Sequence, residues 1–196
     1  MGEILVTFMG NLERPPFEHV VLVDNQNLPT GTAEKSVIHG PETPLHRGFS
    51  VFLFDRSGNL LLQQRNLEKK TWPGVWSNSC CGHPQLGETT VEAMQRRVND
   101  ELGIADVQIQ VVLPDYRYRY ERFGVVENEF CPVAVGVIEE EPVPNPDEVN
   151  AIAWKPWEEF LSEVAGESEY SEWSIEEARL LARNESFQEF YKGITE

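Results

Sequence analysis

The 23 residues from 82 to 104 constrain the fold of this 196-residue chain more than any other stretch. They read G-x5-E-x7-R-R-V-N-D-E-L-G-I, a loop that leads into one amphipathic helix. Thr89 and Glu92 have the spacing of a capping box, and Gly103 is a typical helix stop. Apolar residues recur at helical spacing between these ends and predict the buried stripe of the helix, Val91, Met94, Val98 and Leu102. We therefore expect a loop followed by a helix over residues 89–102.

The same helix carries charged side chains one turn apart, and they admit two interpretations. Acidic residues at this spacing, placed after a loop, can hold a divalent cation against a diphosphate. Alternatively, the charged face is solvated and forms i,i+4 pairs, Arg96 with Asp100 and Arg97 with Glu101. The length of the pattern, with both glycines in register, favours the first interpretation.

The rest of the chain predicts strands on both sides of this helix. Alternating or apolar runs bounded by turn residues predict strands at 18–23, 49–54, 59–65, 107–120, 125–138 and 151–155. A short helix is expected at 157–164 and a longer terminal helix at 173–191. The expected fold class is α+β, an α/β/α sandwich with a mixed sheet, extended by the C-terminal helices. Residues 1–17 are expected to form an N-terminal extension to a single domain, residues 18–196.

The formal charge of −17 is unevenly distributed and narrows the class of ligand. Residues 1–138 hold 12 basic and 17 acidic side chains, whereas residues 139–196 hold 4 and 16. Such a chain repels nucleic-acid backbones and anionic membrane surfaces, so we expect neither as a partner. A small anion is still compatible with the nearly balanced first part.

Cysteine usage and hydropathy predict the compartment. Cys80, Cys81 and Cys131 are an odd number with two neighbours in sequence, which does not fit a disulfide framework. No segment approaches the ~20 apolar residues of a membrane span. Residues 1–10 have no basic cluster and too short an apolar run for a secretory signal. We therefore expect a cytoplasmic protein with free thiols.

Imidazole and carboxylate side chains occur in a pattern that suits a metal ion. Three histidines lie in polar or glycine-containing stretches and two glutamates lie on one face of a predicted strand: His39, His46, His83, Glu127 and Glu129. Three imidazoles with two carboxylates would suit Mn²⁺, Zn²⁺ or Mg²⁺. His19 opens a strand and is interpreted as structural. The sequence does not establish that the five side chains converge.

A thiol and a tyrosine complete the candidate site. Cys81 lies just before the predicted helix, where a metal and nearby cations would favour its thiolate. If the turn Phe123-Gly124 has two residues, Tyr118 pairs with Glu129 across a hairpin. Tyrosine and arginine alternate along the first strand of this hairpin. For all these residues but Tyr118, a solvent-facing arginine edge with core tyrosines explains the pattern equally well.

Several motifs together resemble those of a known family. The run T-W-P-G-V-W-S-N-S-C-C-G-H-P at residues 71–84 is similar to the active-site segment of type I isopentenyl diphosphate isomerases, which have the Nudix fold. The resemblance extends to residues 29–35, 45–50, 116–119 and 127–129. The stretch 82–104 resembles the Nudix box, G-x5-E-x7-R-E-U-x-E-E-x-G-U, with two departures. Arg97 stands where the box has a glutamate, and Asp100 replaces another.

The resemblance implies a role for each matching residue. Cys81 and Glu129 match the catalytic pair, and Tyr118 matches a tyrosine beside the catalytic carboxylate. The ligands of a buried divalent metal match His39, His46, His83, Glu127 and Glu129. Glu101 and the backbone carbonyl of Cys81 match the ligands of Mg²⁺ at the substrate diphosphate. The cations that would contact the diphosphate match Lys35, Arg65, Lys69 and Arg97, and an aromatic cover over the hydrocarbon matches Trp173.

The activity implied is the interconversion of isopentenyl diphosphate and dimethylallyl diphosphate. A proton would be added and another removed across an allylic system, through a tertiary carbocation-like state. The implied cofactors are Mg²⁺ with the diphosphate and Mn²⁺, Mg²⁺ or Zn²⁺ in the His/Glu site, in a monomer or homodimer. In Nudix hydrolases the acids of the box bind metals that activate water, so Arg97 argues against hydrolysis. A Nudix diphosphate hydrolase and a non-catalytic metal-binding module remain the alternatives.

Overall fold

A mixed sheet forms the centre of the computed structural model, which describes residues 17–166 and 168–196. In this described part, five of its strands follow the order β12-β5-β4-β11-β8, with two short strands paired to β5 and β4. β4 and β11 are parallel, and the other pairs are antiparallel. The strands are β4 (Phe49–Phe54), β5 (Asn59–Arg65), β6 (Trp76–Ser77), β7 (Cys80–Gly82), β8 (Gln108–Leu113), β11 (Val133–Val137) and β12 (Val149–Pro156).

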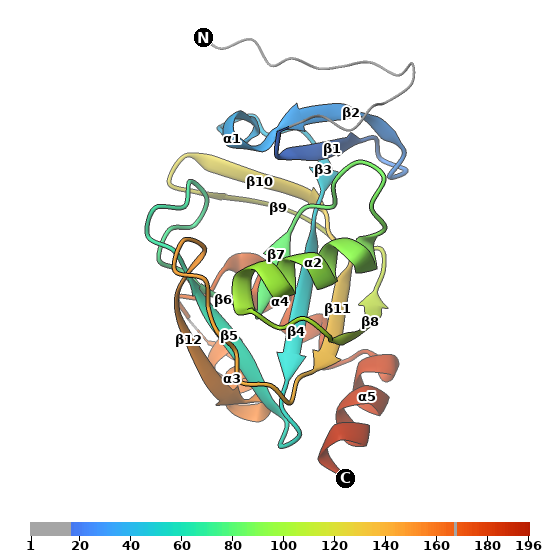
Figure 1. Cartoon of the computed structure of the whole chain (residues 1–196), viewed down its shortest axis with the longest axis vertical. Helices are drawn as coiled ribbons and strands as arrows, with labels where there is room; N and C mark the ends of the chain where they lie inside the picture. The colour runs from blue at the N-terminus through green and yellow to red at the C-terminus, as the bar shows by residue number, and fades with distance from the viewer. Residues whose placement is uncertain (1–16, 167) are drawn as a thin grey trace.

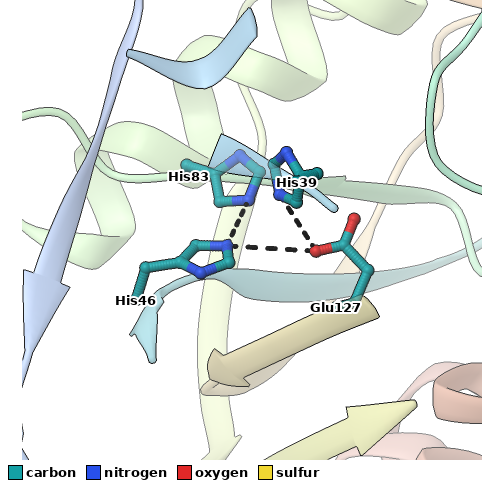
Figure 2. Close-up of side chains that lie close together, drawn as sticks. All are labelled: His39, His46, His83 and Glu127. Carbon is teal, nitrogen blue, oxygen red and sulfur yellow. Dashed lines mark hydrogen bonds and ion pairs between the residues drawn. The ribbon is translucent and has the colours of Figure 1, made fainter. Parts of the chain in front are cut away.

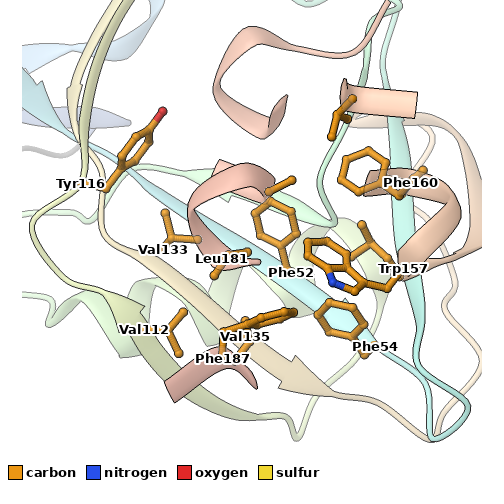
Figure 3. Packing of buried hydrophobic residues seen from close by; sticks show 14 of the residues in the cluster. Phe52, Phe54, Val112, Tyr116, Val133, Val135, Trp157, Phe160, Leu181 and Phe187 are labelled. Atoms are coloured by element: carbon orange, nitrogen blue, oxygen red, sulfur yellow. The ribbon is translucent and has the colours of Figure 1, made fainter. Parts of the chain in front are cut away.

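Helices cover both faces of this sheet. α2 (Thr90–Leu102) crosses one face, in front of β4 in Figure 1. The opposite face is covered by α3 (Trp157–Ala165), α4 (Glu172–Leu181) and α5 (Glu185–Thr195). Side chains alternate along β4 as a strand requires, so that Phe52 and Phe54 pack toward α3 and α5 while Val51 and Leu53 pack toward α2. Figure 3 shows the first of these two cores. The expected α/β/α sandwich is confirmed.

A second sheet lies beyond one end of the central sheet, at the top of Figure 1. Its order in the described residues is β2-β1-β3-β10-β9, and a short helix, α1 (Lys35–Ile38), follows β2. The strands are β1 (His19–Val23), β2 (Pro29–Glu34), β3 (His46–Arg47), β9 (Arg117–Arg122) and β10 (Val125–Phe130). β3 continues into β4 and β10 into β11, so two parallel connections pass side by side from one sheet to the other. The sequence did not predict this second sheet.

The termini of α2 follow the predicted local chemistry. The Thr89 side chain accepts a hydrogen bond from the Glu92 backbone N–H at 3.2 Å, and the Glu92 carboxylate accepts one from the Thr89 N–H at 2.8 Å. Gly103 ends the helix with φ of 70°, a conformation that favours glycine. The buried positions differ from the predicted stripe, because Val91 is only half-buried, whereas Ala93, Arg97 and Glu101 are buried. A capping box and a glycine stop are local interactions, which explains why the sequence located this helix.

Two predicted strands are wrong in extent. Residues 107–120 form β8 and β9, which belong to different sheets, and residues 125–138 form β10 and β11, which are divided in the same way. The first break falls at Pro114 and Asp115, and the second at Pro132. Proline cannot donate a ladder hydrogen bond, so each strand ends there and the chain turns toward the other sheet.

The predicted terminal helix 173–191 is also wrong, because it consists of α4 and α5. Asn184 interrupts it, and its side chain accepts a hydrogen bond from the Phe187 N–H at 2.9 Å as the N-cap of α5. The predicted extension, residues 1–17, lies outside the described residues except for Phe17. Among the described residues, none of the helices has the length and apolarity that crossing a membrane requires.

Candidate active site

A cavity of about 330 Å³ opens where the two sheets, α1, α2 and the loop between β5 and β6 meet. Twelve of the thirteen site residues expected from the sequence line it: Lys35, His39, Arg65, Lys69, Cys81, His83, Arg97, Glu101, Tyr118, Glu127, Glu129 and Trp173. The thirteenth, His46, is fully buried and contacts His83 and Glu129 of the cavity wall. Residues that lie far apart in the sequence therefore share one site.

Three imidazoles and a carboxylate converge at one side of this cavity. Donor atoms of His39, His46, His83 and Glu127 all lie within 4.8 Å of one another. His46 Nε2 is 3.2 Å from His83 Nε2, and His39 Nε2 is 3.1 Å from Glu127 Oε2 (Figure 2). The side chains come from four different segments: the end of α1, β3, the loop after β7, and β10. This convergence could not be derived from the sequence.

The donor atoms of this cluster fit a divalent metal ion. His39 Nε2 and Glu127 Oε2 are buried and, within the described residues, take part in no hydrogen bond of good geometry. His46 Nδ1 is 2.9 Å from the Pro44 carbonyl oxygen, which directs Nε2 into the cluster. Imidazole nitrogen and carboxylate oxygen are ligands for first-row divalent ions. The cluster can therefore hold a metal, and its donor set does not specify which one.

Glu129 lies against the same histidines. Its Oε1 is 3.0 Å from His83 Nε2 and 3.6 Å from His46 Nε2. Burial favours a raised pKa for Glu129, but hydrogen bonds from His46 and His83 outweigh it and leave the pKa lowered. Burial lowers the pKa of His83 to about 4. Glu129 is thus a carboxylate beside a neutral His83.

Cys81 is buried in the cavity wall beside two polar side chains. Its Sγ is 3.1 Å from Asn78 Oδ1 and 3.6 Å from Ser50 Oγ. Burial, followed by the nearby Glu177 carboxyl, raises the pKa of Cys81 to about 12. Burial therefore favours the thiol, whereas the thiolate expected from the sequence depends on a metal and nearby cations. The physical reason is that Cys81 lies in the cavity wall rather than at an exposed helix terminus.

Aromatic side chains cover the wall next to Cys81. The predicted hairpin register is confirmed, since Tyr118 pairs with Glu129 and Tyr120 with Glu127. The Tyr118 ring stacks on Trp173 at a centroid distance of 5.7 Å. Trp173 is buried by contacts to Trp72 as well, and its indole N–H donates to Asn78 Oδ1 at 3.2 Å. Asn78 therefore holds both the thiol and the indole in place.

Cations line the other side of the cavity, and each contacts a polar or acidic group. Arg97 forms ion pairs with Glu101 and, at 3.2 Å, with Glu148. Because Arg97 and Glu101 are buried, the solvated-surface interpretation is wrong for this pair. Both predicted i,i+4 pairs exist, and the second, Arg96 with Asp100 at 3.7 Å, is more exposed. Three more of the cations contact neighbours in the same wall: Lys69 contacts Glu148, Lys35 contacts Glu18 at 2.7 Å, and Arg65 donates to Thr71.

Three site residues were missed from the sequence. Asn78 lies within the predicted active-site run, where its amide side chain stands among small residues. This amide could have marked Asn78 as a site residue. Glu177 is one helical turn from Trp173 and is fully buried, with its Oε2 unpaired among the described residues. Burial raises the pKa of Glu177 well above its usual value. Glu148 follows a proline-rich loop, and nothing in its local sequence marks it as a cavity residue.

Comparison with known proteins gives the same picture for the fold. A family model of the NUDIX domain matches residues 44–178. A crystal structure of DR0079 from Deinococcus radiodurans is similar with a TM-score of 0.64 and 22% identity, covering 86% of this chain and 99% of that one. The MutT protein of Methanosarcina mazei Go1 has a TM-score of 0.58 at 17% identity, over 71% and 94% of the two chains. These structures share the fold with this chain.

Comparison with curated protein sequences gives more similar relatives than the solved structures do. A protein of Saccharopolyspora erythraea named isopentenyl-diphosphate Delta-isomerase is 46% identical over 158 residues, which are 80% of this chain and 81% of the relative. Proteins of the same name from Klebsiella pneumoniae and Citrobacter koseri are 45% and 42% identical. The alignment to the Citrobacter protein covers 90% of this chain and 98% of that protein.

Proposed function

The chain belongs to the NUDIX family, among the isopentenyl-diphosphate Delta-isomerases, and on this premise we propose that its cavity interconverts isopentenyl diphosphate and dimethylallyl diphosphate. The observation that carries the proposal is one cavity with a thiol and a carboxylate, Cys81 and Glu129, beside a wall of cations. A hydrolase of this fold needs acids that position a metal-bound water. Here Arg97 occupies one of those positions and is buried against Glu101.

The chemistry assigned to Cys81 and Glu129 is proton transfer to and from carbon. In the resting protein the thiol carries a proton and the carboxylate accepts one, so the pair supplies one donor and one acceptor. One group protonates an end carbon of the double bond, and the other removes a proton from the carbon at the far end of the allylic unit. For the reverse reaction the two roles exchange. Tyr118, opposite Glu129 in the register, positions that carboxylate.

The charge that develops in this reaction requires a dry aromatic wall. A tertiary cation-like centre beside a diphosphate would be captured by water, so the cavity has to exclude it. Trp173 and Tyr118 present stacked rings, and an aromatic face stabilises a nearby cation by about 1–2 kcal/mol. We assign Trp173 as the cover over the hydrocarbon part of the substrate.

The metal and the diphosphate are assigned to separate parts of the cavity. His39, His46, His83, Glu127 and Glu129 would hold a Mn²⁺, Mg²⁺ or Zn²⁺ ion. When bound, this ion supplies positive charge that offsets the two buried carboxylates and fixes Glu129. The diphosphate with its Mg²⁺ is assigned to the cationic wall: Lys35, Arg65, Lys69, Arg97, Glu101 and the carbonyl of Cys81.

We also propose that residues 18–196 form one domain and that the protein is cytoplasmic.

The direct test is to incubate the purified protein with isopentenyl diphosphate and Mg²⁺ in D2O. We expect dimethylallyl diphosphate with deuterium in its methyl group, observed by NMR, and no release of phosphate. Cys81→Ala and Glu129→Gln should lose at least about 1,000-fold in rate while the fold persists. Cys80→Ala is the matched control, because this neighbour packs into the α2 core and does not line the cavity. Phosphate release without isomerisation would support the hydrolase, and a wild-type rate in Cys81→Ala would refute the assignment.

A further inference from the structure

Glu148 occupies a position in the cationic wall that the reaction does not explain. Its carboxylate bridges two cations, with Oε1 3.2 Å from Arg97 Nη2 and Oε2 in contact with Lys69 Nζ. About 25% of its side chain is exposed, on the cavity side. Burial favours a raised pKa for Glu148, but Lys69 and Arg97 outweigh it and lower the pKa to about 2. A permanent negative charge therefore lies between two groups assigned to bind an anion.

The loop that carries Glu148 is fixed at both ends. The Asn145 N–H donates to the Glu101 carbonyl at 2.8 Å, which ties the loop to the last turn of α2. The Asn66 N–H donates to the Glu148 carbonyl at 3.1 Å, and the Asn66 side chain donates to Pro146 at 2.6 Å. The loop thus connects the element that bears Arg97 with the loop that bears Lys69. Glu148 is held between them by backbone contacts as well as by its charge.

The charges around the cavity make this placement consequential. Among the described residues that line it, five are basic and six are acidic: Lys35, Arg65, Lys69, Lys70 and Arg97 against Glu18, Glu34, Glu101, Glu127, Glu129 and Glu148. Without an ion in the His/Glu cluster this lining has no net positive charge, and a divalent ion there leaves an excess of only one positive charge. A bare diphosphate therefore meets several good donors but little net attraction. A diphosphate that already carries a divalent cation has less negative charge, so the carboxylates repel it less, and it can contact them through its ion. The residues that line the cavity therefore favour a diphosphate whose charge is partly neutralised by a bound cation.

We propose that Glu148 is a specificity-determining residue of the diphosphate site, which makes the site accept the magnesium complex of a diphosphate in preference to the free anion. The inference rests on the proposed function for the location of the diphosphate. Glu148 also keeps Lys69 and Arg97 in one orientation in the free protein, so their positions are set before the ligand arrives. When the complex binds, its phosphate oxygens take over contacts to these cations that the Glu148 carboxylate makes in the free protein.

Binding of inorganic diphosphate, measured by calorimetry with and without added Mg²⁺, tests this inference without requiring catalysis. The protein is dialysed into magnesium-free buffer without a chelator, so that any ion in the His/Glu cluster is retained. Wild-type protein should bind diphosphate much more tightly with Mg²⁺ than without it. Glu148→Gln should bind the free anion about tenfold more tightly than wild type, which is the effect of one nearby like charge in a partly exposed site. The ratio of the two dissociation constants should shrink accordingly.

Glu139→Gln is the matched control, because it removes the same charge from an exposed ion pair with Arg56 outside the cavity. It should leave the ratio unchanged. An equal loss of binding in Glu148→Gln with and without Mg²⁺ would mean that Glu148 is only structural, and would overturn the inference. Wild-type protein that binds the free anion as tightly as the complex would overturn it even if the variant does not fold. The proposed isomerase function fails on a different observation, the absence of dimethylallyl diphosphate.

Discussion

Removal of the metal from the His/Glu cluster should measurably destabilise the protein. The four side chains of the cluster are 0–11% exposed, and two of their donor atoms form no hydrogen bond of good geometry within the described part of the chain. Without an ion, the imidazole and carboxylate lone pairs remain buried and face one another. An ion that binds the folded state alone removes this cost, because ligand binding and folding are linked.

The expected size of the effect follows from this linkage. At one hundred times its dissociation constant, a ligand of the folded state raises the free energy of unfolding by about 2.7 kcal/mol. A chain of this length melts about 2–4 °C higher per kcal/mol. Addition of Mn²⁺ or Zn²⁺ to chelated protein should therefore raise the melting temperature by about 5–10 °C, and metal analysis of the purified protein should find about one retained ion per chain.

Two histidine variants separate metal binding from packing. His39→Gln should abolish the metal-induced rise in melting temperature, since it removes one donor. His19→Gln is the control: His19 is equally buried, but its Nε2 accepts from the Leu86 N–H at 2.9 Å and it is not part of the cluster. This variant should melt lower yet keep the full metal-induced rise. An unchanged melting temperature on chelation, or a full rise in His39→Gln, would refute the reasoning.

Three further predictions follow from particular contacts. Trp173→Ala should lower the free energy of unfolding by about 3–5 kcal/mol and abolish most of the isomerase rate. Trp173→Phe should lower the free energy of unfolding by about 1 kcal/mol, because it loses the hydrogen bond to Asn78 but keeps a ring against Tyr118. Equal losses for the two variants in urea unfolding would contradict this. Thr89→Ala should cost about 1 kcal/mol with an unchanged kcat, and a larger loss of kcat would mean that the cap has another role. The stability that the Glu148 charge provides is fully present above pH 4.5 and declines as the pH falls toward 2. The difference in melting temperature between wild type and Glu148→Gln should therefore become smaller from pH 7 to pH 3. A difference that stays constant over this range would refute the prediction.

Part of the site could be predicted from the sequence, because it depends on residues that are close together in the chain. The hairpin register follows from a two-residue turn at Phe123-Gly124, and it brings Tyr118 opposite Glu129 without any long-range information. The strand limits at Pro114 and Pro132 were missed although both prolines were visible, because alternation continues across them. Which sheet a strand joins depends on partners that are distant in the chain.

Electrostatic properties were the least predictable. The thiolate expected for Cys81 depends on a metal and nearby cations, and burial, which the sequence did not reveal, opposes it by raising the pKa of the thiol. Arg97 was recognised as a departure from the box and its i,i+4 pair with Glu101 was anticipated, but its second pair, with Glu148, depends on a loop more than forty residues downstream. The pKa of a buried group depends on all neighbours in space, and most of these are remote in sequence.

The sequence by itself determined the capped helix α2, the hairpin and the list of chemically capable side chains, because spacing and turn residues act over a few positions. The tertiary structure decided that twelve of these side chains line one cavity, that three histidines meet Glu127, and that Glu148 lies between Lys69 and Arg97. These outcomes require that β3–β4 and β10–β11 run side by side from one sheet to the other. Such long-range pairings are fixed by the packing of the whole domain, so no local pattern encodes them.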